Sequence, residues 1–377
     1  MKRPRTSHLD HNSKDHLIRG TFSKLIREAN RVAILVPDFS EYSGNGRVAA
    51  VQAEELVKEG KEVVIFTLRA RLHPRHVKVF VLGMPRSLFW ERIYTLIFPL
   101  DLIKVFKWLK KLKRFDLIIS HFYPMNWLAF LAKRFYGKKY IYWYHGIVNP
   151  PSLFPRFHER IATWLDIFLT KLTTRNVDHA VSVSRSAQKE LKELIGLDSE
   201  VIYNKPDLKK FHKGVDGSEI RRKLNLGDAP VILNVGRICP QKGTHLLVQA
   251  FLLVKKRIPN AKLVIVGKHT FDYYSKQVKK LCDDSVIFAG FVPDDELPKY
   301  YAMSDIYATC SLWEAHNVPV LEAQACGKPV IAFDFDFFRE EVDENGILVE
   351  RENIEKFAEA CIKKLKEVRP ELQLQLS

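Results

Sequence analysis

Short apolar runs that end in a glycine or a polar loop alternate with amphipathic segments along most of this chain, at a spacing of about 30 residues. The C-terminal half has such runs at residues 231–235, 264–267, 286–292, 306–311 and 330–333. The N-terminal half has its own series, at residues 32–36, 62–67, 116–120, 140–144 and 180–184. This repetition predicts an α/β fold with parallel, doubly wound sheets, whose ligands bind at the carboxyl ends of the strands.

The two series predict two domains, since 377 residues exceed a single ordinary core. We expect residues 1–30 to be a polar, basic extension outside the fold. In this prediction residues 31–205 form the first Rossmann-like domain and residues 206–377 form the second. The polar stretch at 209–217, which contains glycine, is expected to be the linker between them.

Two glutamates eight positions apart, Glu314 and Glu322, lie in the segment at 311–330. Pro319 lacks a backbone N–H and favours the first turn of a helix, and Asn317 suits the N-cap position. Gly327 can supply a left-handed cap at the end of the helix. The segment therefore predicts a short helix at residues 318–326, with Glu314 in the loop before it and Glu322 near its first turn.

This arrangement allows both carboxylates to face one ligand beside the unpaired N–H groups of the helix start, which favour an anion. Carboxylates accept hydrogen bonds well from sugar hydroxyls. A ligand with hydroxyls at both ends and a diphosphate between them would satisfy the whole set. The alternative is that Glu322 only complements the helix dipole and that Glu314 is a solvated loop residue.

A second loop follows the apolar strand at 231–235 and contains Gly236, Arg237, Lys242 and Gly243. Arginine presents a planar fork to oxyanions, whereas lysine is a mobile point charge. Two such cations five positions apart on a strand-to-helix turn can clamp both phosphates of a diphosphate. The alternative is a pair of solvated surface cations.

The spacing of Glu314 and Glu322, with Ala-Cys-Gly-Lys-Pro after them, resembles the signature of the family 4 retaining glycosyltransferases. The Gly-Arg-x4-Lys-Gly spacing is similar to the donor-phosphate loop of that family, and the resemblance covers about residues 31–365. It implies the GT-B fold, with two Rossmann-like doubly wound parallel-sheet domains facing a central crevice. The first domain would then lie on the acceptor side, and the second would bind the nucleotide-sugar donor.

The resemblance also implies roles for single residues. Glu314 would contact the donor sugar and Glu322 the ribose hydroxyls, while Arg237 and Lys242, after Gly236, would hold the diphosphate. His145, at the end of the strand at 140–144, would contact the transferred sugar or its phosphate. The remaining implied positions are the first strand-to-helix turn, where the family has a glycine-rich loop, and the start of the donor helix: Gly44, Gly46, His316, Asn317 and Val318.

Without the resemblance, Gly44 and Gly46 are as consistent with an ordinary turn as with a ligand site, and a lone histidine such as His145 is more often structural. The chain also departs from the family pattern, which has glycines after the first glutamate where this sequence has Ala315, His316 and Asn317. We expect the Cβ of Ala315 to narrow the donor pocket and His316 to add a polar contact.

The expected activity is that of a retaining hexosyltransferase, which moves a sugar from a UDP- or GDP-sugar to an acceptor glycan or lipid-linked acceptor. Fixed cations and N–H dipoles can stabilise the leaving phosphate, so no metal or other cofactor is expected. Retention is implied by the resemblance alone. Two alternatives stay open: a GT-B sugar-nucleotide epimerase, and a catalytically silent nucleotide-sugar-binding subunit.

The chain is strongly basic, with a formal net charge of +16. Residues 86–114 hold eight basic and two acidic side chains, interleaved with large aromatic ones, and residues 154–171 form a second aromatic and basic stretch. This pattern is typical of protein segments that lie in the interfacial layer of an anionic membrane. The alternative is two ordinary surface helices with buried aromatic faces. No RNA-recognition signature accompanies the basic residues, so nucleic acid is not an expected partner.

We expect a cytoplasmic protein, in peripheral contact with the inner membrane face. No apolar run reaches the roughly 18 residues that span a bilayer, and residues 1–30 lack the hydrophobic core of a signal peptide. The five cysteines include no Cys-x-x-Cys pair, which is consistent with free thiols in a reducing compartment.

Overall fold

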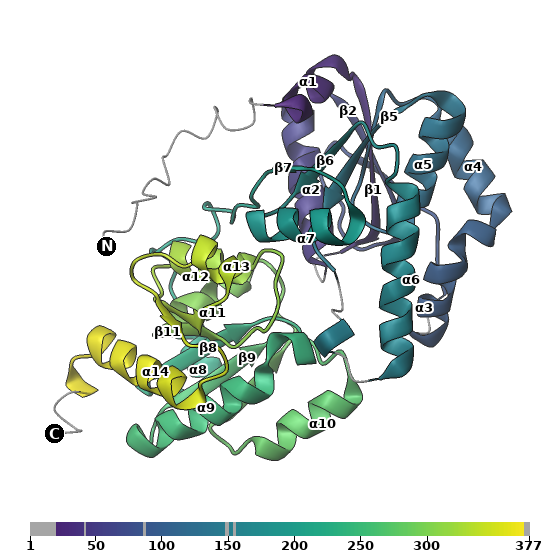
Figure 1. The fold of residues 1–377 in the computed structure, drawn as a ribbon. Helices are drawn as coiled ribbons and strands as arrows, with labels where there is room; N and C mark the ends of the chain where they lie inside the picture. Colours follow the sequence, from purple (N-terminus) through teal and green to yellow (C-terminus); the bar gives the residue numbers. More distant parts are fainter. Residues whose placement is uncertain (1–19, 41–42, 86–87, 148–150, 154–155, 373–377) are drawn as a thin grey trace, which may run out of the picture. The chain divides into compact units, whose positions relative to one another are not determined.

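The fold was analysed in a computed structural model, which describes residues 20–40, 43–85, 88–147, 151–153 and 156–372 (Figure 1). The chain divides into two compact units. The first contains the residues up to 143 together with 172–181 and 198–200. The second contains residues 144–171, 182–197 and those from 201 onward. This division differs from the predicted boundary at 205, because the segments 144–171 and 182–197, which contain helix as well as loop, group with the second unit.

A seven-stranded sheet in the order β3-β2-β1-β4-β5-β6-β7 forms the centre of the N-terminal part. β1 pairs in parallel with β2 and β4, and β4 pairs in parallel with β5. The strands β1, β2 and β4 are almost wholly buried, as expected for a sheet covered by helices on both faces. The strands are β1 (Arg31–Phe39), β2 (Glu62–Ala70), β3 (Lys78–Val81), β4 (Leu117–Ser120), β5 (Lys139–Tyr144), β6 (His179–Ser182) and β7 (Glu200–Val201).

The helices of this part of the chain connect successive strands in the way that the sequence repeat predicts. One buried contact is the ring of Trp108, on α4, which packs edge-to-face on Phe66 of β2 at 5.3 Å. The helices are α1 (Thr21–Glu28), α2 (Gly44–Lys58), α3 (Leu88–Ile97), η1 (Phe98–Leu100), α4 (Leu102–Leu112), α5 (Met125–Tyr136), η2 (Pro151–Leu153), α6 (Phe157–Thr173) and α7 (Arg185–Ile195).

A six-stranded sheet in the order β10-β9-β8-β11-β12-β13 forms the centre of the second unit, and all its pairings are parallel. β8 lies in the middle, between β9 and β11. The strands are β8 (Val231–Val235), β9 (Lys262–Val266), β10 (Val286–Gly290), β11 (Ile306–Thr309), β12 (Val330–Phe333) and β13 (Ile347–Val349). The helices are α8 (Ser218–Lys223), η3 (Pro240–Lys242), α9 (Thr244–Arg257), α10 (Asp272–Leu281), α11 (Leu297–Met303), α12 (Val318–Ala325), α13 (Asp336–Glu341) and α14 (Ile354–Val368).

Alternate residues of these strands enter two separate cores, one on each face of the sheet. Ile232 of β8 packs with α9, α10 and α14, whereas its neighbour Leu233 packs with α8, α11, α12 and α13. Figure 1 shows α9, α10 and α14 on one side of the sheet and α11, α12 and α13 on the other. The period of two along each strand therefore builds the predicted doubly wound arrangement.

The prediction that the first 30 residues lie outside the fold is wrong for residues 21–28. These residues form helix α1, whose apolar side chains Phe22, Leu25 and Ile26 are buried. The ring of Phe22 packs edge-to-face on Trp143 at 5.4 Å. Residues 1–19 of the predicted extension lie outside the described residues. The apolar positions three and four residues after Phe22 give this short helix one buried face, although most of its residues are polar.

The first strand-to-helix turn, where the resemblance implies a glycine-rich loop, is short in the structure. Residues 37–39 before it belong to β1, and Gly44 and Gly46 belong to the first turn of α2, where Ser43 accepts a hydrogen bond from the Gly46 N–H at 3.2 Å. A Cβ on Gly46 would lie 2.7 Å from the Ser40 carbonyl oxygen. Packing of the helix start on its own loop therefore explains this glycine.

Of the helices in the described part of the chain, none has the length and apolarity needed to cross a membrane.

The first unit contains a buried histidine that predicts a pH dependence of stability. His121 follows β4, is fully buried, stacks on Trp143 and has its Nε2 3.1 Å from Gln52 Oε1. Burial lowers the pKa of His121 to about 3. In the unfolded chain the histidine gains a proton below about pH 6.5, whereas the folded form does not, so stability is lost as the pH falls through this range.

We therefore expect this histidine alone to lower the free energy of unfolding by about 1.4 kcal/mol between neutral pH and pH 5.5. Urea unfolding across this range measures the effect. In His121→Gln, which keeps a polar side chain beside Gln52, that part of the pH dependence should disappear. His158→Gln, a change at an exposed histidine of α6, is the matched control. Equal pH slopes for wild type and His121→Gln would contradict the assignment.

Candidate active site

The predicted phosphate loop follows β8, the central strand of the second sheet. Gly236 and Arg237 come directly after the strand, Lys242 ends the short helix η3, and Gly243 precedes α9. Gly243 has a φ of +56°, and a Cβ there would lie 2.1 Å from the carbonyl oxygen of Cys310. Only glycine meets both requirements, so this residue fixes the loop against the end of β11.

The two cations of this loop have different surroundings. Lys242 Nζ lies 2.5 Å from Glu314 Oε1, and the side chains of Lys242 and Glu314 are 18% and 6% exposed. Arg237 is half-buried, and its guanidinium forms no hydrogen bond or ion pair with any residue in the described ranges. The structure thus brings Lys242 together with the first glutamate of the predicted pair, while the arginine fork stays available to an oxyanion.

The predicted helix after Glu314 is confirmed as α12, one residue shorter than expected at its end. Gly327 has a φ of +74° just after the helix, and the buried strand β12 follows. Asn317 occupies the N-cap position, but its side chain does not cap the helix. The Asn317 amide instead donates to Glu314 Oε1 at 3.0 Å. The N-cap interpretation is therefore correct in position and wrong in its hydrogen bond.

Glu322 lies in the second turn of α12 rather than near the first, and it is buried. Its Oε2 accepts a hydrogen bond from the hydroxyl of Tyr301 at 2.7 Å. Tyr301 belongs to α11, so two helices on one face of the sheet hold this carboxylate. Val318, the other predicted contact here, is the first residue of α12.

His316 lies among protein groups. Its Nδ1 is 3.2 Å from Glu341 Oε1, an ion-pair distance without the alignment of a hydrogen bond, and its Nε2 is 3.1 Å from the carbonyl oxygen of Asn204. Burial disfavours the charged ring, but the neighbouring Glu341 carboxylate outweighs it, so the pKa of His316 is raised. The expected polar contact of His316 with the donor remains a prediction, and the structure gives this side chain a different partner.

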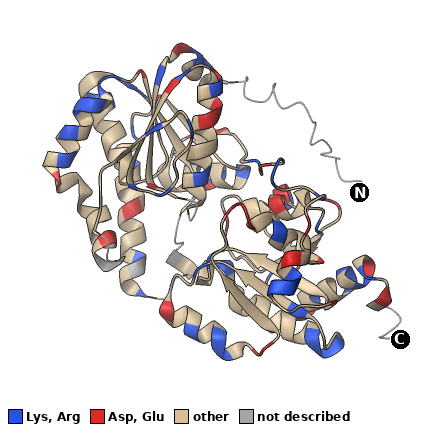
Figure 2. Ribbon diagram, turned by 180° about the vertical axis from the view of Figure 1, so that it is seen from behind, with Lys and Arg blue, Asp and Glu red and all other residues tan. Residues whose placement is uncertain are grey.

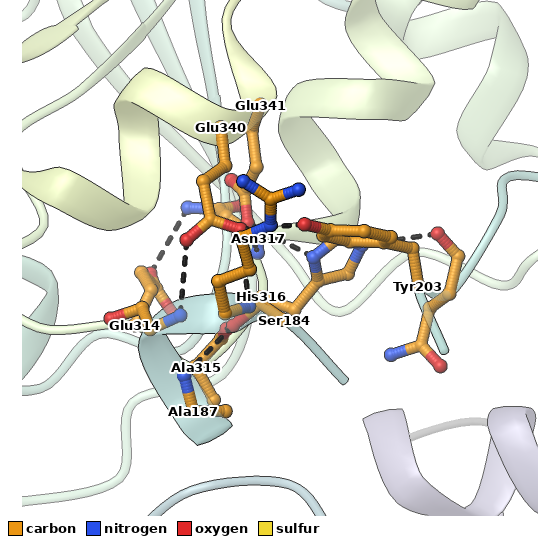
Figure 3. Close-up of polar contacts among 12 residues, drawn as sticks. Ser184, Ala187, Tyr203, Glu314, Ala315, His316, Asn317, Glu340 and Glu341 are labelled. Atoms are coloured by element: carbon orange, nitrogen blue, oxygen red, sulfur yellow. Dashed lines mark hydrogen bonds and ion pairs between the residues drawn. The ribbon is translucent and has the colours of Figure 1, made fainter. Parts of the chain in front are cut away.

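The loop at 313–317 is held by groups from several elements (Figure 3). The Ser184 hydroxyl donates to the carbonyl oxygen of Ala315 and accepts from the N–H of Ala187, and Glu341 accepts from the N–H of Asn317 at 2.7 Å. Glu340 accepts from the N–H groups of Arg185 and Ser186 at the start of α7, and from the Tyr203 hydroxyl. Side-chain contacts therefore fix the loop where the family pattern has glycines.

The turn that contains His145 packs directly against this loop. Gly146 has a φ of +80°, and a Cβ there would lie 2.5 Å from the Cβ of Ala315 and 2.6 Å from the Trp313 ring. The structure thus places His145, the residue before this glycine, next to the loop of Glu314. The predicted narrowing of the donor pocket by Ala315 remains a prediction, and in the structure the Cβ of Ala315 lies against Gly146.

The structure brings most of the predicted residues together within the second unit: His145, Gly236, Arg237, Lys242, Glu314, His316, Asn317, Val318 and Glu322. Gly44 and Gly46 belong to the first unit, and their donor role remains a prediction. In the described ranges, no cluster of three or more His, Cys, Asp or Glu side chains has a geometry that could hold a metal ion.

Several residues that support the site were not identified from the sequence: Ser184, Glu190, Tyr301, Glu340 and Glu341. Ser184 has the one visible signal, since a serine at the start of a helix suggests an N-cap. The acids carry no such signal, because a glutamate on a helix is usually solvated. Glu190 and Ser184 bind partners that lie more than 100 positions away along the chain, namely Trp313 and Ala315.

Two family profiles match consecutive parts of the chain. Glycosyltransferase Family 4 matches residues 42–210, and Glycosyl transferases group 1 matches residues 216–376. Together they cover both units.

Two of the similar proteins are named as sugar transferases. The chain is 27% identical over 226 residues to a GDP-mannose-dependent alpha-(1-6)-phosphatidylinositol monomannoside mannosyltransferase of Mycolicibacterium smegmatis, covering 55% of this chain and 56% of the relative. It is 27% identical over 281 residues to a UDP-Gal:alpha-D-GlcNAc-diphosphoundecaprenol alpha-1,3-galactosyltransferase of Escherichia coli, covering 70% and 69%. The aligned part thus spans about half the length of the mannosyltransferase.

Solved structures share the fold over nearly the whole chain. HepE of Anabaena in complex with UDP and glucose has a TM-score of 0.71 at 20% identity, covering 92% of this chain and 95% of HepE. Sucrose-phosphate synthase of Thermosynechococcus elongatus has a TM-score of 0.73 at 20% identity and the same coverage. With both family profiles matched and two parallel-sheet units in place, the chain belongs to the family 4 glycosyltransferases of the GT-B fold.

Proposed function

We propose that this protein transfers a hexose from a nucleotide-diphosphate sugar to an acceptor hydroxyl, with retention of anomeric configuration. The observation that carries the proposal is the pairing of Lys242 with Glu314 near Arg237, whose guanidinium has no partner among the described residues. One small region thereby offers two cations for a diphosphate and a carboxylate for sugar hydroxyls. The buried carboxylate of Glu322, on α12, is the proposed contact for the ribose.

The chemistry follows from where charge develops. As the bond between the anomeric carbon and the phosphate oxygen breaks, negative charge grows on the leaving diphosphate. Fixed cations in a partly buried site stabilise that charge more than water does. Arg237 can bind two phosphate oxygens at once, and Lys242 adds a point charge. We propose that these residues act without a metal or another cofactor.

Retention and the donor type are supported by family membership and by the relatives. One relative is named for GDP-mannose and another for UDP-galactose, so a UDP- or GDP-hexose is the proposed donor class. In a retaining reaction of this type, the acceptor attacks from the face that the diphosphate leaves, and the departing phosphate accepts the acceptor proton. His145, packed beside the donor loop, is proposed to contact the sugar or its phosphate.

A donor panel of UDP-galactose, UDP-glucose and GDP-mannose tests the reaction. Proton NMR follows the release of the nucleoside diphosphate and the anomeric configuration of the first product. We expect slow hydrolysis of one donor in water and faster turnover when an acceptor is added. Release of an epimerised free sugar would favour the epimerase, and donor binding without any turnover would favour the silent binding subunit.

The proposed acceptor is lipid-linked, and the outer face of α4 supports a membrane location. Ile103, Leu102 and Phe106 are exposed on this helix, and Leu100 just before it is also exposed, with Ile103 at 84%. The same helix carries Lys104, Lys107, Lys110 and Lys111, the kind of residue that is blue along the ribbon in Figure 2. Exposed apolar side chains can enter the interfacial layer of a bilayer, and the lysines between them can bind anionic head groups.

The alternative of ordinary surface helices with buried aromatic faces holds for Trp108, which is buried, but not for Phe106 or for Trp90 on α3, which are exposed. Helix α6 carries a similar exposed stripe, spaced at helical intervals: Phe157, Ile161, Trp164 and Phe168. Residues 86–87 and 154–155 of the two predicted stretches lie outside the described residues. We propose that the exposed face of α4 contacts anionic lipid on the cytoplasmic side of the inner membrane.

A double variant, Ile103→Ser with Phe106→Ser, is expected to lower binding to vesicles of anionic lipid about tenfold or more. Two side chains of this size contribute at least about 1.4 kcal/mol to binding when the bilayer buries them. Vesicle sedimentation at physiological salt measures the binding. Phe135→Ser, at an exposed phenylalanine of α5, is the matched control. Equal binding of the double variant and the control would refute the membrane role of α4.

A further inference from the structure

A single carboxylate, that of Glu190 on α7, connects the His145 turn to the donor loop. It accepts hydrogen bonds from the Tyr144 hydroxyl at 2.5 Å and from the Ile147 N–H at 3.0 Å, and both bonds end on Oε1. Its Oε2 accepts from the indole N–H of Trp313 at 2.8 Å. Tyr144 and Ile147 flank the turn on both sides, and Trp313 directly precedes Glu314.

The three donors of Glu190 are neutral, and no Lys or Arg in the described ranges forms an ion pair with this carboxylate. Burial raises the pKa of Glu190, although the hydrogen bonds from Tyr144, Ile147 and Trp313 oppose that shift. Burial of a carboxylate without a cation lowers the stability of the fold, and an apolar side chain of similar volume is often at least as stable in such a position. Stability alone therefore does not explain a glutamate here. Its value lies in the fixed directions of its hydrogen bonds.

The surfaces that it joins are in tight contact. Gly146 and Ala315 approach so closely that a Cβ on the glycine would lie 2.5 Å from the Cβ of Ala315. A small displacement of either segment therefore moves His145 relative to Glu314. Misplacement of a reacting group by about 1 Å costs on the order of 100-fold in rate.

We propose that Glu190 is a positioning residue, which orients the His145 turn on the donor loop through Tyr144, Ile147 and Trp313. This inference rests on the proposed function, because it assigns the contact a role in sugar transfer. Glu190 itself is proposed to touch neither the donor nor the acceptor. Its effect should therefore appear in the rate of the chemical step and not in the binding of a nucleoside diphosphate.

The kinetic test compares Glu190→Ala and Glu190→Gln with Glu193→Gln, a change at an exposed glutamate of the same helix. We expect Glu190→Ala to lower kcat about 100-fold on UDP-galactose or GDP-mannose, with the Kd of UDP or GDP changed by less than about 3-fold. The kcat of Glu190→Gln should lie between those of Glu190→Ala and wild type, since its amide oxygen replaces only one of the two carboxylate acceptors. If Trp313 transmits the effect, Glu190→Ala with Trp313→Phe should be no slower than Glu190→Ala alone.

A second readout does not depend on activity. Hydrogen exchange of peptides that contain residues 144–147 and 313–317 should be about tenfold faster in Glu190→Ala than in wild type and Glu193→Gln. Unchanged exchange and kcat in Glu190→Ala would overturn the proposal. A parallel loss of kcat, UDP or GDP binding and Tm would also overturn it, as that pattern marks a purely structural residue. If wild type bound and turned over no nucleotide sugar, the proposed function would fail, while the exchange result would still decide the contact.

Discussion

Arg237→Ala is expected to lower kcat/KM for the nucleotide-sugar donor about 100- to 1000-fold, because removal of one preorganised group from the developing charge has an effect of this size. The change should leave the Tm of the protein nearly unaltered. The guanidinium has no hydrogen-bond or ion-pair partner among the described residues, so its removal strands no buried charge.

Steady-state kinetics and thermal unfolding of the same preparation measure the two effects. Arg237→Lys keeps the charge without the fork, and we expect it to recover only part of the activity. Arg257→Ala, at an exposed arginine in the last turn of α9, is the control for loss of one positive charge. A kcat/KM for Arg237→Ala within about 3-fold of wild type would remove this residue from the phosphate site.

Lys242→Ala is expected to lower kcat/KM by a similar factor and also to destabilise the fold by about 3–5 kcal/mol, because it leaves the carboxylate of Glu314 buried without its cation. Glu314 is only 6% exposed, so water cannot replace the ammonium group freely. The loss of activity and the loss of stability have separate causes, and a second substitution separates them.

In the double variant Lys242→Ala with Glu314→Gln, the buried charge is gone, and the amide can still accept the hydrogen bond from Asn317. We expect most of the stability to return while kcat/KM stays low. Lys255→Ala, whose partner Asp283 is exposed, should change stability by less than about 1 kcal/mol and serves as the control pair. Wild-type turnover in Lys242→Ala would exclude the clamp role, and equal destabilisation in single and double variants would exclude the buried-charge explanation.

The sheets and most helices could be predicted from the sequence because each depends on local periodicity. The run at 330–333 becomes the buried strand β12, and Gly327 marks the end of α12 as its left-handed conformation requires. The predicted loop after β8 holds Arg237 and Lys242 where the alternation of strand and helix puts them. Helix α1 was missed since its few apolar residues, such as Phe22, are diluted by polar neighbours.

The partners inside the site were less predictable, since they depend on contacts between distant segments. The sequence identifies His316 as part of a departure from the family pattern, but it does not show that Glu341 lies 3.2 Å from His316. Similarly, Glu190 resembles a solvated helix residue until α7 is seen beside Trp313. The two parts of the site thus differ in how far the sequence predicts them: spacing along the chain indicates the proposed ligand contacts, whereas the residues that hold them are known only from packing.

Titration calorimetry of the wild-type protein with UDP, GDP and their hexose conjugates tests the central claim most directly, namely that the second unit binds a nucleotide-sugar donor through Arg237 and Lys242. We predict binding of at least one nucleotide with a Kd below about 1 mM. In Arg237→Ala the Kd should rise about tenfold or more, as expected for loss of a charged hydrogen-bond pair. Failure of every nucleotide and nucleotide sugar to bind at millimolar concentrations would contradict the account.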